Sequence, residues 1–148
     1  MPSSKPSMIV LDAGVAVWTL APGPTDTSRL FEQWAEQALW APEIWLPEVI
    51  SVLRGLEFAG MLTRSETEQA IADAFLLDVQ VFPTDETLAL ASLAWARRLQ
   101  QRRAYDGLYV ALAERLNAPL WTTDRRLVHS LQKLGVAWAH WVGESLAD

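Results

Sequence analysis

Short apolar segments alternate with longer helical stretches along this chain of 148 residues. Residues 8–11 are a continuous apolar run, which is typical of a strand buried on both faces. Further strands are expected at residues 79–82, 119–123 and 136–141. Strands separated by helices predict a parallel sheet with helices on both faces. We therefore expect one α/β/α domain with a four- or five-stranded, mostly parallel sheet.

The helices are predicted from apolar side chains that recur at helical spacing. Residues 26–39 read as an amphipathic helix, with Thr25 or Asp26 as its cap. The segment from Ser65 to Glu68 resembles a capping box, and Thr84 is expected to cap the helix that follows. The other helices are predicted at residues 14–20, 43–60, 105–117 and 124–134.

Composition excludes several kinds of site. Without cysteine, the chain has no disulfides, no cysteine-ligated zinc and no thiol catalysis. His129 and His140, its only histidines, offer little material for a His-rich metal site or a Ser-His-Asp triad. The first residues do not form a secretory signal, and no uncharged run approaches membrane-spanning length, so a cytoplasmic protein that does not enter a membrane is expected. The folded domain is predicted at residues 8–142, between tails at 1–7 and 143–148.

The charge pattern leaves two alternatives open. A net charge of −6 argues against nucleic-acid binding over the whole surface, but it does not exclude a local basic strip. Such a strip reads either as a solvated helix face or as a track for phosphates. The six arginines concerned are Arg97, Arg98, Arg102, Arg103, Arg125 and Arg126.

Four carboxylates lie in apolar sequence near the ends of predicted elements: Asp12, Glu48, Asp106 and Asp124. An acidic side chain in apolar surroundings is costly without a partner, and four together repel one another unless a divalent cation intervenes. Ligands of open parallel sheets bind outside the carboxyl ends of the strands. Asp12 and Asp124 follow predicted strands and Asp106 begins a helix, so this topology would bring the acids to one edge.

Each acid also has an ordinary structural interpretation. Asp106 and Asp124 fit the N-cap positions of their helices, and Asp12 fits a turn after a strand. A salt bridge to Arg54, or to another arginine, would account for Glu48. On the residues alone, the metal site and these structural roles remain alternatives.

Four segments together resemble the motifs of the PIN-domain ribonucleases, especially the VapC-type toxins of prokaryotic toxin–antitoxin pairs. They are MIVLDAGV at 8–15, APEIWLPEVISVL at 41–53, AYDGLYVALAE at 104–114 and LWTTDRRL at 120–127. In the second segment, Glu48 follows Pro42 by six residues and Ser51 follows Glu48 by three, as in the family. The likeness runs from residue 8 to about residue 140.

The resemblance implies a three-layer PIN-like domain and a Mg²⁺- or Mn²⁺-dependent endoribonuclease that cleaves RNA through a metal-activated water. It implies that Asp12, Glu48, Asp106 and Asp124 hold the metal, with Thr122 in support. In such an enzyme the six arginines are the candidate contacts for substrate phosphates. Hard oxygen ligands suit these cations, and no side-chain nucleophile is then required. A cognate antitoxin and a homodimer are the partners that the family implies.

Two positions depart from the family pattern. Position 14 is Gly, where many relatives have Ser or another small polar residue, so any hydroxyl contact from that position is lost. Pro47 precedes Glu48 and should kink the helix or mark its first turn.

Two other functional classes fit the sequence less well than the nuclease. A phosphoryl-accepting receiver domain needs an adjacent pair of acids and a suitably placed lysine, and Lys133 falls too late in the chain. A phosphatase of the haloacid-dehalogenase type needs a second Asp where Gly14 stands. A non-catalytic PIN-like module that binds nucleic acid or protein remains the main alternative.

Overall fold

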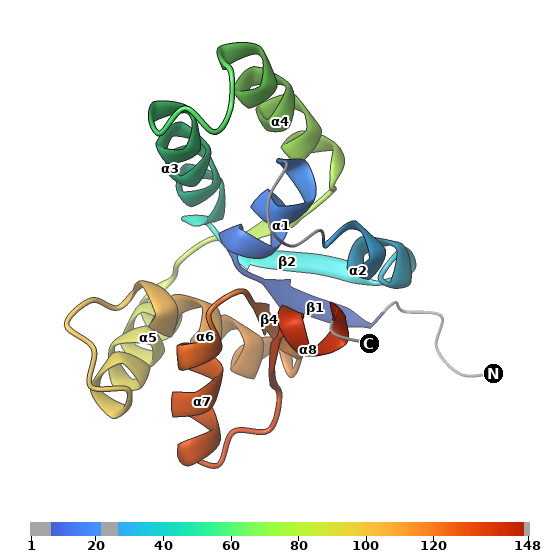
Figure 1. The fold of residues 1–148 in the computed structure, drawn as a ribbon. Coiled ribbons are helices and arrows are strands. Elements are labelled where there is room, and N and C mark those ends of the chain that lie inside the picture. The colour runs from blue at the N-terminus through green and yellow to red at the C-terminus, as the bar shows by residue number, and fades with distance from the viewer. Residues whose placement is uncertain (1–6, 22–26, 147–148) are drawn as a thin grey trace.

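The computed structural model describes residues 7–21 and 27–146, which form five strands and eight helices (Figure 1). In chain order these are β1 (Met8–Leu11), α1 (Ala13–Leu20), α2 (Ser28–Gln33), β2 (Ala38–Pro42), α3 (Trp45–Phe58), α4 (Arg64–Leu76), β3 (Gln80–Phe82), α5 (Glu86–Arg98), α6 (Tyr105–Leu116), β4 (Leu120–Thr122), α7 (Arg125–Lys133), β5 (Ala139–Trp141) and α8 (Val142–Leu146). None of the helices in these two ranges is long and apolar enough to cross a membrane.

The strands form one sheet in the order β3-β2-β1-β4-β5, and all four pairings are parallel. The chain runs outward from β1 to β3 and then returns to the other side of β1, where it forms β4 and β5. The strand order therefore reverses between β1 and β4. Such a switch point is where open α/β sheets bind their ligands, beyond the carboxyl ends of the strands.

Helices cover both faces of the sheet, which confirms the three-layer prediction. Figure 1 shows α1 to α4 on one side and α5 to α7 on the other. Right-handed crossovers require this division, because the connections from β1 to β3 run in the direction opposite to those from β3 to β5. Elements from both layers therefore meet at the switch point.

The predicted helix at residues 26–39 is wrong in its second half. Helix α2 ends at Gln33, and residues 38–42 form strand β2 between β1 and β3. Ala38, the last apolar position of the predicted helix, is in fact the first residue of this strand. Pairing on both edges of that strand outweighs its local preference. Thr25 and Asp26, the expected caps, lie outside the described residues.

Helix starts were predicted to within a few residues. Pro47 lies in the first turn of α3, where its missing N–H costs no helical hydrogen bond, so it does not kink the helix. The capping box at α4 is formed by Thr63 and Glu66, and Asp85 rather than Thr84 caps α5. Thr63 lies two residues before the predicted Ser65, and Asp85 lies one residue after Thr84. In both helices the side-chain oxygen of the actual cap accepts a free backbone N–H of the first turn.

Close packing of α5 against α6 fixes the position of α6 under the sheet. A Cβ atom at Gly107 of α6 would overlap the backbone oxygen of Ser92 and lie 3.2 Å from its carbonyl carbon. From Tyr109 to Ala113, α6 is buried all round, and Val110 and Leu112 are fully buried. The first turn of α6 is thereby held rigidly beside the switch point.

We predict that Gly107→Ala destabilises the fold by about 1–3 kcal/mol, because the new methyl group overpacks a backbone contact. Gly55→Ala in α3 is the matched control, since nothing lies within 4 Å of a Cβ at that position. It should stabilise the chain by about 0.5–1 kcal/mol through helix propensity alone. Urea unfolding of both variants measures this, and equal effects at the two sites would contradict the packing account.

Candidate active site

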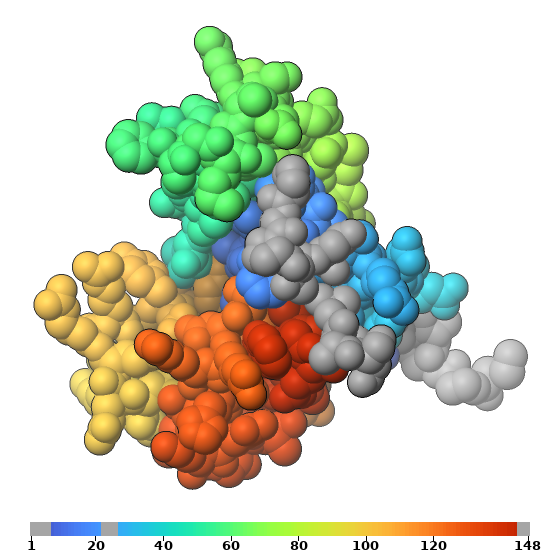
Figure 2. All heavy atoms as spheres, viewed as in Figure 1, coloured from blue at the N-terminus to red at the C-terminus, as the bar shows by residue number. Residues whose placement is uncertain are grey.

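A cavity of about 280 Å³ opens at the switch point between β1 and β4, and we call it the acidic pocket. Three of the four predicted carboxylates line it: Asp12 after β1, Glu48 on α3 and Asp106 on α6. The remaining lining comes from Ala13, Gly14, Trp18, Val52, Tyr109, Leu120, Thr122, Thr123 and Leu127. Figure 2 shows the molecular surface hollowed between the α3–α4 arm and the α5–α7 group.

Asp12 is anchored by three hydrogen bonds. Its Oδ1 accepts from the backbone N–H of Val15 at 3.0 Å, so Asp12 is the N-cap of α1 rather than a turn residue. Its Oδ2 accepts from the Thr122 hydroxyl and from the backbone N–H of Thr123. Burial nevertheless raises the pKa of Asp12 to about 6, and the nearby charge of Glu48 adds to this rise.

Glu48 lies in the first turn of α3, close to the positive end of the helix dipole. Its Oε1 accepts a hydrogen bond of 2.5 Å from the Tyr109 hydroxyl on α6. Partial burial raises the pKa of Glu48, with a further contribution from the charge of Asp106. The salt bridge to Arg54 is wrong, because Arg54 pairs with Glu57 at 2.9 Å.

Asp106 lies in the first turn of α6 and accepts a hydrogen bond of 2.9 Å from the side-chain amide of Gln101. The cap position of α6 is taken by Ala104, so the N-cap interpretation of Asp106 is wrong. Burial raises the pKa of Asp106, and the negative charge of Asp124 raises it further. A carboxylate whose charge raises the pKa of another lies within electrostatic reach of it.

Asp124 is the N-cap of α7, as its capping interpretation predicted, and its Oδ1 accepts from Leu127 N–H at 3.1 Å. It is exposed and stands beside the acidic pocket rather than in its lining. Thr122, which is fully buried, connects it to Asp12. The Thr122 hydroxyl accepts from the Asp124 backbone N–H at 2.9 Å and donates to the Asp12 carboxylate.

The donor chemistry of the pocket fits a hard divalent cation. Among the described residues, none of the four carboxylates forms an ion pair with Arg or Lys. In the same part of the chain, no three acidic or His side chains converge closely enough to hold a metal ion by themselves. Mg²⁺ does not need such a cage, because proteins commonly bind it through one or two carboxylates and several waters.

The six predicted phosphate contacts are all exposed, and none lines the acidic pocket. Arg125 and Arg126 open α7 directly after Asp124, and Arg102 and Arg103 directly precede the first turn of α6. Within the described ranges they make no ion pair. The guanidinium of Arg98 instead lies 4.2 Å from the ring centre of Trp95, and that of Arg125 lies 4.9 Å from that of Trp141.

Sequence reasoning missed three side chains that line the pocket or hold one of its carboxylates. Tyr109 follows Asp106 by three residues and so shares its helix face, a signal that was present in the pattern. Gln101 lies in the connection before α6, where no periodic signal exists. Thr123 lies where a Cβ at Gly14 would have to be, since that atom would overlap the Thr123 hydroxyl and come within 3.1 Å of its methyl group.

A model of the PIN domain matches residues 9–130 of this chain. The chain belongs to the PIN-domain family. It is 36% identical to ribonuclease VapC3 of Mycobacterium tuberculosis over 132 residues, which cover 87% of this chain and 91% of that protein.

Solved structures share the fold of this PIN domain at low sequence identity. PAE2754 from Pyrobaculum aerophilum has a TM-score of 0.69 at 16% identity, covering 99% of this chain and 96% of that one. FitAB bound to a DNA fragment has a TM-score of 0.64 at 20% identity, covering 91% and 95%. VapC20 of Mycobacterium tuberculosis, a toxin that cleaves the sarcin-ricin loop, has a TM-score of 0.56 at 14% identity, covering 78% and 87%.

We predict that the stability of Asp12→Asn relative to wild type rises with pH in this PIN domain. Because the pKa of Asp12 rises from 3.8 to about 6 on folding, ionisation of its carboxylate destabilises the folded state progressively between these pH values. The stability of the variant relative to wild type should therefore increase by about 2–2.5 kcal/mol between pH 4 and pH 7.5, at about 1.36 kcal/mol per pKa unit. Urea unfolding with EDTA at both pH values measures the change. Asp78→Asn, which removes an exposed carboxylate, controls for net charge.

A second prediction concerns the contact between Gly14 and Thr123. Gly14→Ala should destabilise the chain by about 1–3 kcal/mol, because the new methyl group displaces Thr123. The double variant Gly14→Ala/Thr123→Ala should recover most of this loss. A double-mutant cycle from thermal unfolding measures the coupling, and strictly additive effects would contradict the contact.

Proposed function

We propose that this chain is a Mg²⁺- or Mn²⁺-dependent endoribonuclease and the toxin of a toxin–antitoxin pair. The observation that carries the proposal is a pocket at the switch point of the sheet, lined by three carboxylates that no basic side chain of the described chain neutralises. The similarity to ribonuclease VapC3, which extends over most of both chains, supports the same activity.

Asp12 and Asp106 would hold the cation directly, with Glu48 and Asp124 contributing directly or through water. A bound divalent cation supplies two things in phosphodiester hydrolysis: a water of lowered pKa and neutralisation of the developing phosphate charge. The side chains around these acids have a positioning role. The Thr122 hydroxyl orients Asp12, the Tyr109 hydroxyl orients Glu48, and the Gln101 amide orients Asp106.

The raised pKa values have a consequence for such an enzyme. A carboxylate whose pKa is near 6 is partly protonated in mildly acidic solution, and a protonated carboxyl is a poor ligand for a cation. Cation binding removes the repulsion between Asp12, Glu48 and Asp106, so it should favour the ionised form of all three. Metal affinity would therefore rise with pH through the range in which Asp12 loses its proton.

The arginines that precede α6 and open α7 would contact RNA phosphates on either side of the acidic pocket. Guanidinium groups match phosphate geometry, and these groups are not engaged in ion pairs within the described chain. A local basic strip of this kind is compatible with the net charge of −6, because phosphate contacts depend on the local distribution of charge and not only on its sum. An enzyme of this kind would meet its RNA in the cytoplasm.

An antitoxin and a second copy of the chain are the proposed protein partners. Supporting this, α3, α4 and the turn between them expose large apolar side chains, which is the surface property that a docked protein segment requires. The side chains concerned are Ile50, Val52, Phe58, Met61, Phe75 and Leu76. Val52 also lines the acidic pocket, so a segment docked on α3 would reach its rim.

The proposal predicts metal-dependent cleavage of RNA that needs the pocket carboxylates. With Mn²⁺, the wild-type chain should cleave a mixed RNA substrate, and EDTA should abolish cleavage. Asp12→Asn and Asp106→Asn should each lower the rate by about a hundredfold or more, because loss of even an outer-shell partner of a metal ligand costs about 10–100-fold. Asp78→Asn, an exposed acid outside the pocket, should cleave like wild type.

A measurement without turnover accompanies this assay. Mn²⁺ should raise the thermal unfolding midpoint of wild type at pH 7.5, and should raise it less at pH 5, where Asp12 is mostly protonated. Equal cleavage by all four proteins would assign the activity to a contaminant. Metal-induced stabilisation without cleavage would favour the alternative, a PIN-like binding module that does not cut RNA.

A further inference from the structure

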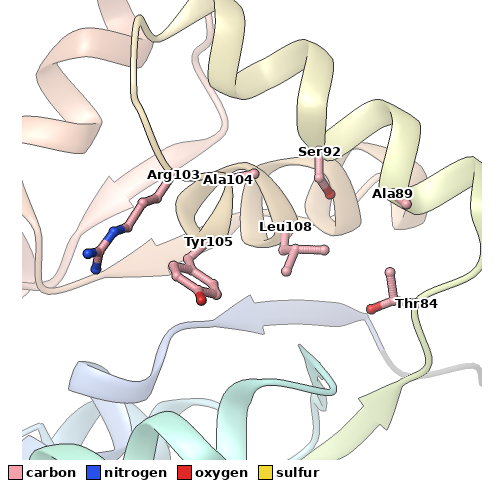
Figure 3. Close-up of a pocket in the computed structure, with 7 residues that line it drawn as sticks. All are labelled: Thr84, Ala89, Ser92, Arg103, Ala104, Tyr105 and Leu108. Carbon is pink, nitrogen blue, oxygen red and sulfur yellow. The ribbon is translucent and has the colours of Figure 1, made fainter.

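A second and larger cavity, of about 700 Å³, lies beside the acidic pocket and contains none of its carboxylates (Figure 3). It lies between α5, α6 and the segments that lead into them. Its lining consists of Thr84, Ala89, Ser92, Arg103, Ala104, Tyr105 and Leu108. A cavity of this size is in the range that accommodates a small organic ligand.

The first turn of α6 separates the two cavities. Tyr105 lines the larger cavity, and the next residue, Asp106, lines the acidic pocket. Successive residues of an α-helix project about 100° apart, so one helical turn presents side chains to both spaces. Leu108 and Tyr109 repeat the division one turn later, on the larger cavity and on the acidic pocket respectively. A ligand that contacts Tyr105 in the larger cavity would therefore contact the residue next in sequence to Asp106 of the acidic pocket.

The lining combines an exposed aromatic ring with a free cation. Figure 3 shows Tyr105 and Leu108 on the same side of α6, with Thr84 facing them from the segment before α5. Tyr105 is 55% exposed, which leaves most of its ring open to stacking. Arg103 is exposed and forms no ion pair within the described residues. The Thr84 hydroxyl has no hydrogen-bond partner in that part of the chain, because only its backbone N–H is engaged, with Glu43 at 3.1 Å.

We propose that this cavity binds one unpaired base of the RNA substrate, next to the phosphodiester held at the acidic pocket. The base stacks on Tyr105 and rests against Leu108, Thr84 offers a donor and an acceptor to its edge, and Arg103 contacts the adjoining phosphate. This inference rests on the ribonuclease activity proposed above, and it adds a site that selects the substrate.

A nucleobase suits these groups better than an apolar protein segment does. A base has a flat π-face for the tyrosine and a polar edge for the hydroxyl, and it carries a phosphate for the arginine. An apolar segment would leave the guanidinium and the hydroxyl without partners as they are desolvated. A base in a duplex could not enter, so the site requires single-stranded RNA or a base turned out of a loop.

The test measures binding separately from cleavage. Labelled single-stranded RNA hexamers (A6, C6 and U6) are titrated with the wild-type chain in EDTA and followed by fluorescence anisotropy. Tyr105→Ala, which removes the stacking ring, should weaken binding about tenfold for the preferred hexamer, in line with the usual contribution of one stacked base. Tyr105→Phe should bind within about twofold of wild type, because it keeps the ring.

Two further variants make the test specific to the cavity. Ala89→Trp introduces a large side chain at an exposed position of the lining and should also weaken binding about tenfold. Val81→Ala shortens a 44% exposed apolar side chain on β3, lies in the lining of neither cavity, and should leave binding unchanged. Circular dichroism and thermal unfolding confirm that each variant is folded.

The outcomes separate this inference from the proposed function. If wild type binds and cleaves RNA while Tyr105→Ala and Ala89→Trp bind as tightly as wild type, the base site is wrong and the nuclease stands. If wild type neither binds nor cleaves RNA, both are wrong. If sedimentation shows that Tyr105→Ala turns a dimer into a monomer, a second copy of the chain occupies the cavity instead, which also overturns the base site.

Discussion

Parallel pairing of β1 with β4 is the interaction on which the rest of the structure depends. It joins residues 10–11 to residues 120–121, across more than a hundred positions of sequence, and so brings Asp12 beside Thr122. The same pairing creates the switch point, because the chain forms β2 and β3 on one side of β1 and β4 and β5 on the other. Helices from both layers then deliver Glu48 and Asp106 to the same opening.

The carboxylates of the acidic pocket are electrostatically unfavourable where they lie. Burial raises the pKa of Asp12, Glu48 and Asp106. At each carboxylate, a hydrogen bond from a neutral side chain lowers the pKa again in part, and no basic side chain takes this role. Neutral donors orient a carboxylate without cancelling its charge, whereas an arginine would form an ion pair with it and close the site. The arrangement keeps the pocket negative, which is the state in which it attracts a cation.

Sequence patterns predicted the elements that show one dominant signal. Examples are the strand at residues 8–11 and the helix at 105–117. The end of α7 was predicted at Gly135, which has the positive φ of 84° expected just after a helix. Strand β2 was missed, because its residues continue a helical spacing and its strand character comes from neighbours on both sides. The four acids were identified from their surroundings. The partners of Glu48 and Asp106 were not, since the contact with Tyr109 crosses between helices and Gln101 lies in an aperiodic connection.

The hydrogen bond between Tyr109 and Glu48 joins α6 and α3, which lie on opposite faces of the sheet (Figure 1). It lowers the proton affinity of Glu48, in opposition to burial. Any change in the spacing of the two helical layers would act on Glu48 in two opposite ways, because it would weaken this bond and also expose the carboxylate to water. The separation of α3 and α6 thus sets both the orientation and the hydration of a carboxylate in the lining of the pocket.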